Sequence, residues 1–253
     1  SNSGGISGQV GSEAEGPRLF GDMSTLTKKG LRGYNEAVMA SISKLLSPLF
    51  EALSPRQKEV VIARFGLEKQ GGEETLAAIG KRMDITRERV RQIEKSALIA
   101  LKKAVQENTS AAEILGRSKK YLKENGGVAR QNALLGHLKS SFDDIRDGHV
   151  NLLIEAAGAF RLRQEDKDFW PFYYLGKNEL KGAMAFIDGW SGALERQKDY
   201  ALAGHYEDLW KNFTKSKGVS KNHAETFLGI SKRIHVNPYG DKGLRHWAEI
   251  RPM

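Results

Sequence analysis

The stretch Thr75–Leu101, TLAAIGKRMDITRERVRQIEKSALIAL, decides the fold that we predict for this chain. Its first part carries an apolar stripe at helical spacing that ends at Met83, and Asp84 and Ile85 then make a short connection. Thr86 is suited to begin a second helix, because its hydroxyl can accept a hydrogen bond from an unpaired amide of the first turn. The stretch is therefore typical of a helix-turn-helix.

The second predicted helix has one apolar face and one polar face. Apolar residues recur at spacings of three or four, so we expect them to be buried. The polar face carries the side chains that read DNA: arginine pairs with guanine, glutamine with adenine, glutamate accepts from cytosine, and lysine meets phosphates. A solvated face of mixed charge is the alternative, but the partner helix and the short turn favour DNA reading. The apolar residues are Val90, Ile93, Ala97 and Leu101, and the polar ones are Arg87, Glu88, Arg91, Gln92 and Lys95.

The segment Leu53–Ala104 resembles region 4 of bacterial sigma factors of the primary, sigma-70 type. The motifs LSPRQ, RFGL, TLAAIGKRM and ITRERVRQIE carry this resemblance, which covers about a fifth of the chain. The resemblance implies that the segment reads a minus-35 promoter element in the major groove of double-stranded DNA. It also implies binding to the flap of the RNA polymerase β subunit. No match to the family's other regions is present, so we do not predict that this chain opens a promoter alone.

The resemblance also implies roles for single positions. Base reading falls to Arg87, Glu88, Arg91 and Gln92. Phosphate contacts fall to Lys81, Arg82 and Arg89, and we add Lys95 to this set. Docking on the polymerase falls to the apolar surface around Val60, Phe65 and Leu98.

The composition indicates a polyanionic partner. The chain of 253 residues carries 40 Lys and Arg against 31 Asp and Glu, which gives a formal net charge of +9 and an isoelectric point near 9.6. Nucleic acid is the first candidate. A membrane surface is the second, but no stretch approaches the roughly 20 apolar residues that a spanning helix needs. Because cysteine is absent, disulfides and thiolate metal sites are excluded. With no spanning helix and a basic charge, we expect a soluble, cytoplasmic protein associated with the nucleoid.

Composition shifts divide the chain into four predicted segments. Residues 1–23 are rich in Gly and Ser, and we expect a flexible tail or a tag remnant. Residues 24–107 hold the region 4-like domain with a leading amphipathic helix at about 31–49. Residues 110–176 are predicted to form a winged-helix-like domain, and residues 177–253 a helical linker with a second, smaller winged-helix-like unit. The predicted fold class is therefore mainly α, with short β-hairpins.

Local signals place several helix ends. The sequence SPRQ at 54–57 is a capping-box start with proline at the first helical position, and Gly66 is suited to end that helix. Ser110 with Glu113 repeats the capping pattern, so we expect the next helix to begin at residue 111. Further helices are expected at 111–124, 132–139, 148–157, 177–203, 206–213 and 220–228, and hairpins at 160–175 and 233–250.

The sequence of the first winged-helix-like unit gives little indication that this unit binds DNA. Its third helix, HVNLLIEAAGAF, offers no Lys or Arg and carries Glu155, so it lacks the electrostatic attraction on which DNA binding depends. We therefore favour a packing or protein-binding role, with Arg161 and Arg163 as possible phosphate contacts on the wing. The second unit is the better secondary DNA contact because it is more basic, through Lys215, Lys217, Lys221, Lys232, Arg233 and Arg245.

The sequence gives little support for an enzymatic activity or for binding of single-stranded nucleic acid. A loop with His235 and Asn237 suggests a metal-dependent nuclease only weakly, because no carboxylate pair accompanies it at ligand spacing. The aromatic run at 170–174 allows a stacking platform for single strands, but packing of the wing against its helices is the preferred interpretation. We predict no catalytic residue, no metal, no cofactor and no small-molecule substrate.

These observations predict a sequence-specific, double-stranded DNA-binding transcription factor that contacts RNA polymerase. The alternative is a protein-interaction module that docks on RNA polymerase or on a sigma-like partner without strong DNA specificity. Salt titration separates the two, because contacts with DNA phosphates weaken steeply as salt is added. A nuclease is the third hypothesis, and metal-dependent cleavage would reveal it.

Overall fold

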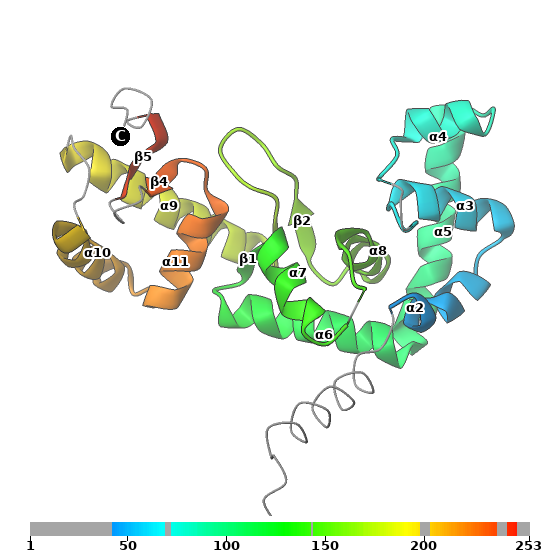
Figure 1. Ribbon diagram of the computed structural model, residues 1–253, viewed down its shortest axis with the longest axis horizontal. Helices are drawn as coiled ribbons and strands as arrows, with labels where there is room; N and C mark the ends of the chain where they lie inside the picture. Colours follow the sequence, from blue (N-terminus) through cyan, green and yellow to red (C-terminus); the bar gives the residue numbers. More distant parts are fainter. Residues whose placement is uncertain (1–41, 69–71, 143, 198–202, 237–241, 247–253) are drawn as a thin grey trace, which may run out of the picture. The chain divides into compact units, whose positions relative to one another are not determined.

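The computed structural model describes residues 42–68, 72–142, 144–197, 203–236 and 242–246 (Figure 1). Helices predominate and two small antiparallel sheets accompany them, which confirms the mainly α prediction. The expected N-terminal tail, most of the expected leading helix and the turn of the last hairpin lie outside the described residues. No helix in the described part has the length and apolar character that a membrane crossing requires.

Helices α2 to α5 form the predicted helix-turn-helix domain. Helix α2 spans Ile42–Glu51, α3 spans Pro55–Arg64, α4 spans Leu76–Arg82 and α5 spans Arg87–Glu107. The capping box at the start of α3 is confirmed, since the Ser54 amide donates to Gln57 Oε1 at 2.9 Å and the Gln57 amide donates to Ser54 Oγ at 3.4 Å. Gly66 follows the end of α3 with a φ of +58°, the left-handed conformation that glycine favours.

The next six elements have the order of a winged helix. Helix α6 spans Thr109–Glu124, α7 spans Gln131–Lys139 and α8 spans Asp147–Ala157, while β1, β2 and β3 span Val128–Arg130, Arg161–Arg163 and Phe172–Tyr174. The antiparallel sheet has the order β1-β3-β2 and pairs Val128 with Tyr174 and Arg161 with Tyr174. The sequence interpretation missed β1, because three residues between two helices give no alternating pattern.

The start of α6 differs from the prediction. Asn108, not Ser110, caps the helix: its Oδ1 accepts a hydrogen bond from the Ala111 amide at 2.8 Å. Asparagine is as good a cap as serine, and it stands two residues earlier. Ser110 therefore lies in the first turn of α6.

The last elements form three helices and a hairpin. Helix α9 spans Lys177–Gln197, α10 spans Ala203–Lys217 and α11 spans Lys221–Ile230, followed by β4 at Ile234–Val236 and β5 at Lys242–Leu244. The predicted hairpin is confirmed by antiparallel pairing of Ile234 with Leu244. Gly189 does not break α9; an added Cβ there would lie 3.3 Å from the Phe213 ring, so the glycine lets α10 approach closely.

Three hydrophobic clusters hold these elements together. A small one joins the helix-turn-helix through Val60, Ile79, Val90 and Ile93. The largest runs from α2 through α5 into α6, α7 and α8, so the helix-turn-helix and the first winged helix share one core. The third holds α9, α10 and α11 around Trp190. In the aromatic run at 170–174, Phe172 and Tyr173 are buried, which supports packing over a stacking platform.

Helix α8 packs against the helix-turn-helix domain. A Cβ on Gly148 would lie 1.9 Å from the backbone oxygen of Phe65, so only glycine permits this approach. The Arg146 guanidinium donates to the backbone oxygens of Leu67 and Glu68 at 2.5 and 2.6 Å. Nearly every residue of α8 from Gly148 to Ala156 is buried, Glu155 being the exception.

Helix α11 packs in a similar way on the unit before it. The Asn222 amide donates to the Glu124 backbone oxygen at 3.2 Å, and the His223 ring lies 3.1 Å from the same oxygen. Gly126 makes room for the Phe227 ring, which would lie 2.8 Å from an added Cβ. Both winged-helix-like units therefore turn their third helix toward the preceding unit.

Candidate nucleic-acid interface

The turn between α4 and α5 fixes the direction of the second helix. Asp84 adopts a φ of +52°, and the Ile85 amide donates to the Gly80 backbone oxygen at 2.9 Å. A Cβ on Gly80 would lie 2.7 Å from the Ile85 oxygen, so a larger residue would push the turn outward. The sequence interpretation placed Asp84 in the short connection but gave Gly80 no role. The signal that could have found Gly80 is a glycine four residues before an Asp in so short a connection.

Threonine caps set the first turns of both helices. The Ala78 amide donates to Thr75 Oγ1 at 3.2 Å, and the Arg89 amide donates to Thr86 Oγ1 at 3.1 Å. The cap predicted at Thr86 is thus confirmed. Val90 and Ile93 anchor the underside of α5 against Val60 and Ile79. The opposite side of its first two turns is consequently held outward.

The four predicted base-reading residues all lie on this outward side. Arg87, Glu88, Arg91 and Gln92 are exposed, and none belongs to a hydrophobic cluster. Glu88 holds Arg91 through two hydrogen bonds, from Nε at 2.8 Å and from Nη2 at 2.7 Å. This pairing lowers the pKa of Glu88, chiefly through the hydrogen bond from Arg91, so the carboxylate stays charged.

The predicted phosphate-contacting residues differ in whether other side chains of the chain already engage them. Lys81, Arg82, Arg89 and Lys95 are all exposed. Arg89 donates to Gln92 Oε1 at 3.1 Å, which keeps both side chains on the reading face. Arg82 is engaged by Glu59 at 2.6 Å and by Glu74 at 3.4 Å. Arg82 therefore ties α4 to α3, and a phosphate would have to compete with two carboxylates for it.

The predicted polymerase-docking surface needs correction. Val60 is fully buried in the helix-turn-helix core, and Phe65 is 6% exposed in the large core beneath α8. Their apolar character reflects packing inside the chain, which a sequence pattern does not separate from an exposed patch. Leu98 alone of the three is partly accessible, since it lies on α5 beside the end of α8.

The wing of the first winged helix offers few free cations. Arg163 pairs with Asp166 at 2.8 Å and lies over the Phe169 ring at 4.7 Å. Lys232, expected to add a DNA contact from the second unit, is held by Glu165 and lies over the Trp170 ring at 4.5 Å. Arg161 is exposed. Arg163 is therefore engaged within the wing, and Lys232 joins the wing to the segment that follows α11.

The nuclease hypothesis requires side chains that hold a metal ion. No group of three His, Cys, Asp or Glu residues there is placed to hold a metal ion. His235 lies on β4, and Asn237, its suggested partner in a nuclease loop, lies outside the described residues.

In a comparison with known protein families, residues 49–103 match the family described as Sigma-70, region 4. The RNA polymerase principal sigma factor HrdD of Streptomyces coelicolor is 39% identical over 90 residues, which cover 35% of this chain and 26% of the relative. The RNA polymerase sigma-B factor of Nostoc sp. is 56% identical over 55 residues, covering 22% and 16%. RpoD of Neisseria gonorrhoeae is 38% identical over 66 residues, covering 26% and 10%. The chain thus spans about a quarter or less of these relatives, and no solved structure matches it.

Proposed function

We propose a function from the premise that residues 49–103 are a sigma-70 region 4 helix-turn-helix domain. The protein is a DNA-binding transcription factor that associates with RNA polymerase. Helix α5 enters the major groove and reads a promoter element of the minus-35 type. The curated relatives are RNA polymerase sigma factors by name, and this supports both partners.

The exposed cluster at the start of α5 carries the proposal. Arg87 and Arg91 present guanidinium groups that pair with guanine, Gln92 suits adenine, and Glu88 can accept from cytosine. Their backbone is fixed by the cap at Thr86 and by the apolar anchors beneath. A helix that presents its first turns in this way has the geometry by which helix-turn-helix proteins contact bases.

Phosphate contacts complete the interface. Lys81 at the end of α4, and Arg89 and Lys95 on α5, are exposed around the reading cluster. Arg82 contributes when a phosphate displaces Glu59 or Glu74. These contacts position the domain and carry no sequence information themselves.

Selection from a random duplex pool, followed by titration of single variants, tests the proposal. The native chain should enrich one preferred site. Arg91→Ala should weaken binding to that site by roughly ten- to a hundredfold and leave binding to random duplex nearly unchanged. Lys81→Ala should weaken all duplexes alike and reduce the salt slope by about one.

Two results would count against base reading. The first is an equal loss on preferred and random duplex for Arg91→Ala. The second is the absence of any preferred duplex together with salt-insensitive binding to RNA polymerase, which would favour a docking module without DNA specificity.

A further inference from the structure

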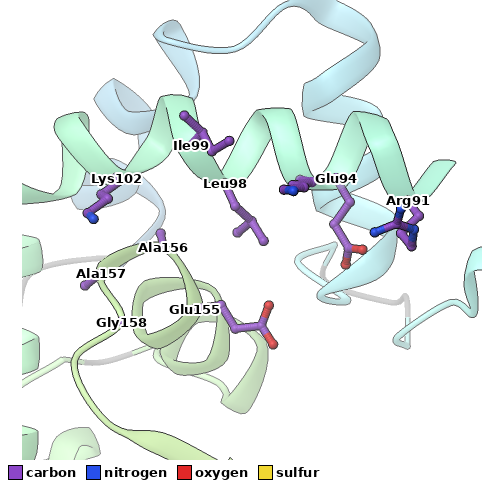
Figure 2. A pocket seen from close by; sticks show the side chains of 10 residues that line it. Arg91, Glu94, Leu98, Ile99, Lys102, Glu155, Ala156, Ala157 and Gly158 are labelled. Atoms are coloured by element: carbon purple, nitrogen blue, oxygen red, sulfur yellow. The ribbon is translucent and has the colours of Figure 1, made fainter. Parts of the chain in front are cut away.

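A groove lies between the middle of α5 and the end of α8 (Figure 2). Its volume is about 370 Å³, and its walls come from Arg91 to Lys102 on one side and from Glu155 to Gly158 on the other. In Figure 2, Leu98 points from α5 toward α8, and Arg91 and Lys102 mark opposite ends of the groove. Sigma region 4 supplies only one wall, and the appended winged helix supplies the other.

Leu98 forms the apolar centre of the groove, and Ile99 lies at its outer rim, where its side chain points away from α8 (Figure 2). Ile99 is 66% exposed, the one large hydrophobic residue among the described residues with such exposure. Leu98 beside it is half-buried. The facing wall is made of Ala156, Ala157 and Gly158, whose small side chains leave space above α8. Exposed apolar surface next to such a space is typical of a binding site for a protein segment.

The charged residues along the groove indicate which kind of protein segment would bind there. Lys95 and Lys102 lie seven residues apart on α5, two helical turns or about 10 Å. Neither has an ion-pair partner among the residues that the structure describes. A helix with carboxylates seven residues apart places them at the same interval. Across the groove, Glu155 provides a single carboxylate for a cation at the edge of that helix.

Duplex DNA fits this groove poorly. Glu94 on one wall is paired with Arg64 at 3.1 Å. Glu155 on the other wall adds one carboxylate against Lys95 and Lys102, so the lining attracts a few placed carboxylates rather than a continuous phosphate backbone. The backbone of DNA also offers no apolar surface to cover Ile99 and Leu98. Burial raises the pKa of Glu155, with a further contribution from the nearby Glu94 carboxylate.

We propose that the α5–α8 groove binds an acidic amphipathic helix of a partner protein. The helix lays its apolar residues on Leu98, Ile99 and Ala157 and directs carboxylates to Lys95 and Lys102. Because the groove opens beside Arg91, a partner bound there sits next to promoter DNA read by the first turns of α5. This inference concerns a second partner, and it does not require base reading to be correct.

Fluorescence anisotropy with a labelled peptide tests the proposal on the full chain. The probe is a helical peptide of about 16 residues, with Leu every three or four positions and Glu elsewhere. A matched peptide carries Lys in place of Glu. We expect the acidic peptide to bind and the basic one not to bind. Ile99→Asp and Lys102→Glu should each weaken binding by roughly tenfold or more.

Lys103→Glu is the control, because it makes the same change of charge one residue away from Lys102 at a position that does not line the groove. Lys103 lies 3.9 Å from Glu107, and both side chains are exposed. It should alter peptide affinity by less than about twofold. Ile99→Asp and Lys102→Glu alter exposed side chains, so urea unfolding should show the same stability as the native chain. A peptide that fails to bind, a preference for the basic peptide, or an equal loss for Lys102→Glu and Lys103→Glu overturns the proposal.

Discussion

Helices α5 and α8 are each the last helix of a small helical unit, yet the molecule uses them in opposite ways. The first two turns of α5 are charged and exposed, and its later turns enter the large core through Leu101 and Val105. Helix α8 is buried over nearly its full length. The 21 residues of α5 allow one helix to face solvent at one end and pack at the other. Of the 11 residues of α8, Glu155 alone is exposed, near the end that lines the α5–α8 groove.

The comparison shows that a winged-helix order of elements does not by itself indicate a DNA reader. In this chain the third helices α8 and α11 contact the preceding unit. Fold and function therefore have to be argued separately, from the surface that each helix leaves open. The start of α5, by contrast, leaves a charged face exposed to solvent.

The largest effect should come from closing the gap that glycine leaves under α8. Gly148→Ala places a Cβ 1.9 Å from the Phe65 oxygen, and we expect the free energy of unfolding to fall by about 3 kcal/mol or more. Gly136→Ala on α7 is the matched control, since nothing lies within 4 Å of an added Cβ there. Urea unfolding of both variants checks this. Equal stability of the two would show that α8 is not held against the Phe65 backbone.

A smaller effect should come from removing the side chain that joins α8 to the end of α3. Arg146→Ala leaves the backbone oxygens of Leu67 and Glu68 without their guanidinium donor, which should cost about 2 kcal/mol. The same substitution at Arg161, an exposed residue, should change stability by less than about 0.5 kcal/mol. Thermal or urea unfolding distinguishes the two, and a loss at Arg161 as large as at Arg146 would contradict the assignment.

The smallest effect should be a dependence of the free energy of unfolding on pH, caused by the buried His149 on α8. Burial, more than the nearby Arg146 guanidinium, lowers the pKa of His149 to about 4, and its Nδ1 accepts from the Arg146 amide at 3.2 Å. An unfolded histidine titrates near pH 6.5. Between these values the unfolded chain binds the additional proton, so the free energy of unfolding should fall as the pH drops from about 6.5 toward 4.

The variant His149→Gln isolates this contribution. Burial raises the pKa values of Asp147 and Glu155, which acts in the opposite direction, but both groups remain in the variant. The acid-induced loss of stability should therefore be smaller in His149→Gln than in the native chain, by about 1 to 2 kcal/mol after allowance for solvent screening. Identical pH profiles would mean that His149 stays accessible to protons in the folded protein.

The sequence predicted α5 well because its signals are local. The cap at Thr86, the apolar spacing from Val90 to Leu101 and the charged face all lie within one stretch of chain. The same holds for the capping box at Ser54 and for the hairpin that closes at Leu244. One difference was also local, since Asn108 and not Ser110 caps α6. The other differences arose from contacts between distant segments.

Three such contacts illustrate the limit. Val60 and Phe65 have the apolar character of a docking surface, and only their neighbours across the fold reveal that they are core. Strand β1 exists because it pairs with β3, more than 40 residues later in the chain. Gly148 is an unremarkable glycine until the Phe65 oxygen is placed beside it. A single sequence carries no direct record of these pairings.

Thiol protection by DNA tests the central contrast between α5 and α8 most directly. The chain has no cysteine, so Gln92→Cys on the reading face and Glu155→Cys on the exposed edge of α8 each provide a single thiol. Labelling of both should be fast in the free protein. A saturating preferred duplex should slow labelling of the Gln92→Cys variant and leave that of Glu155→Cys unchanged. Protection of Glu155→Cys with none at Gln92→Cys would contradict the account.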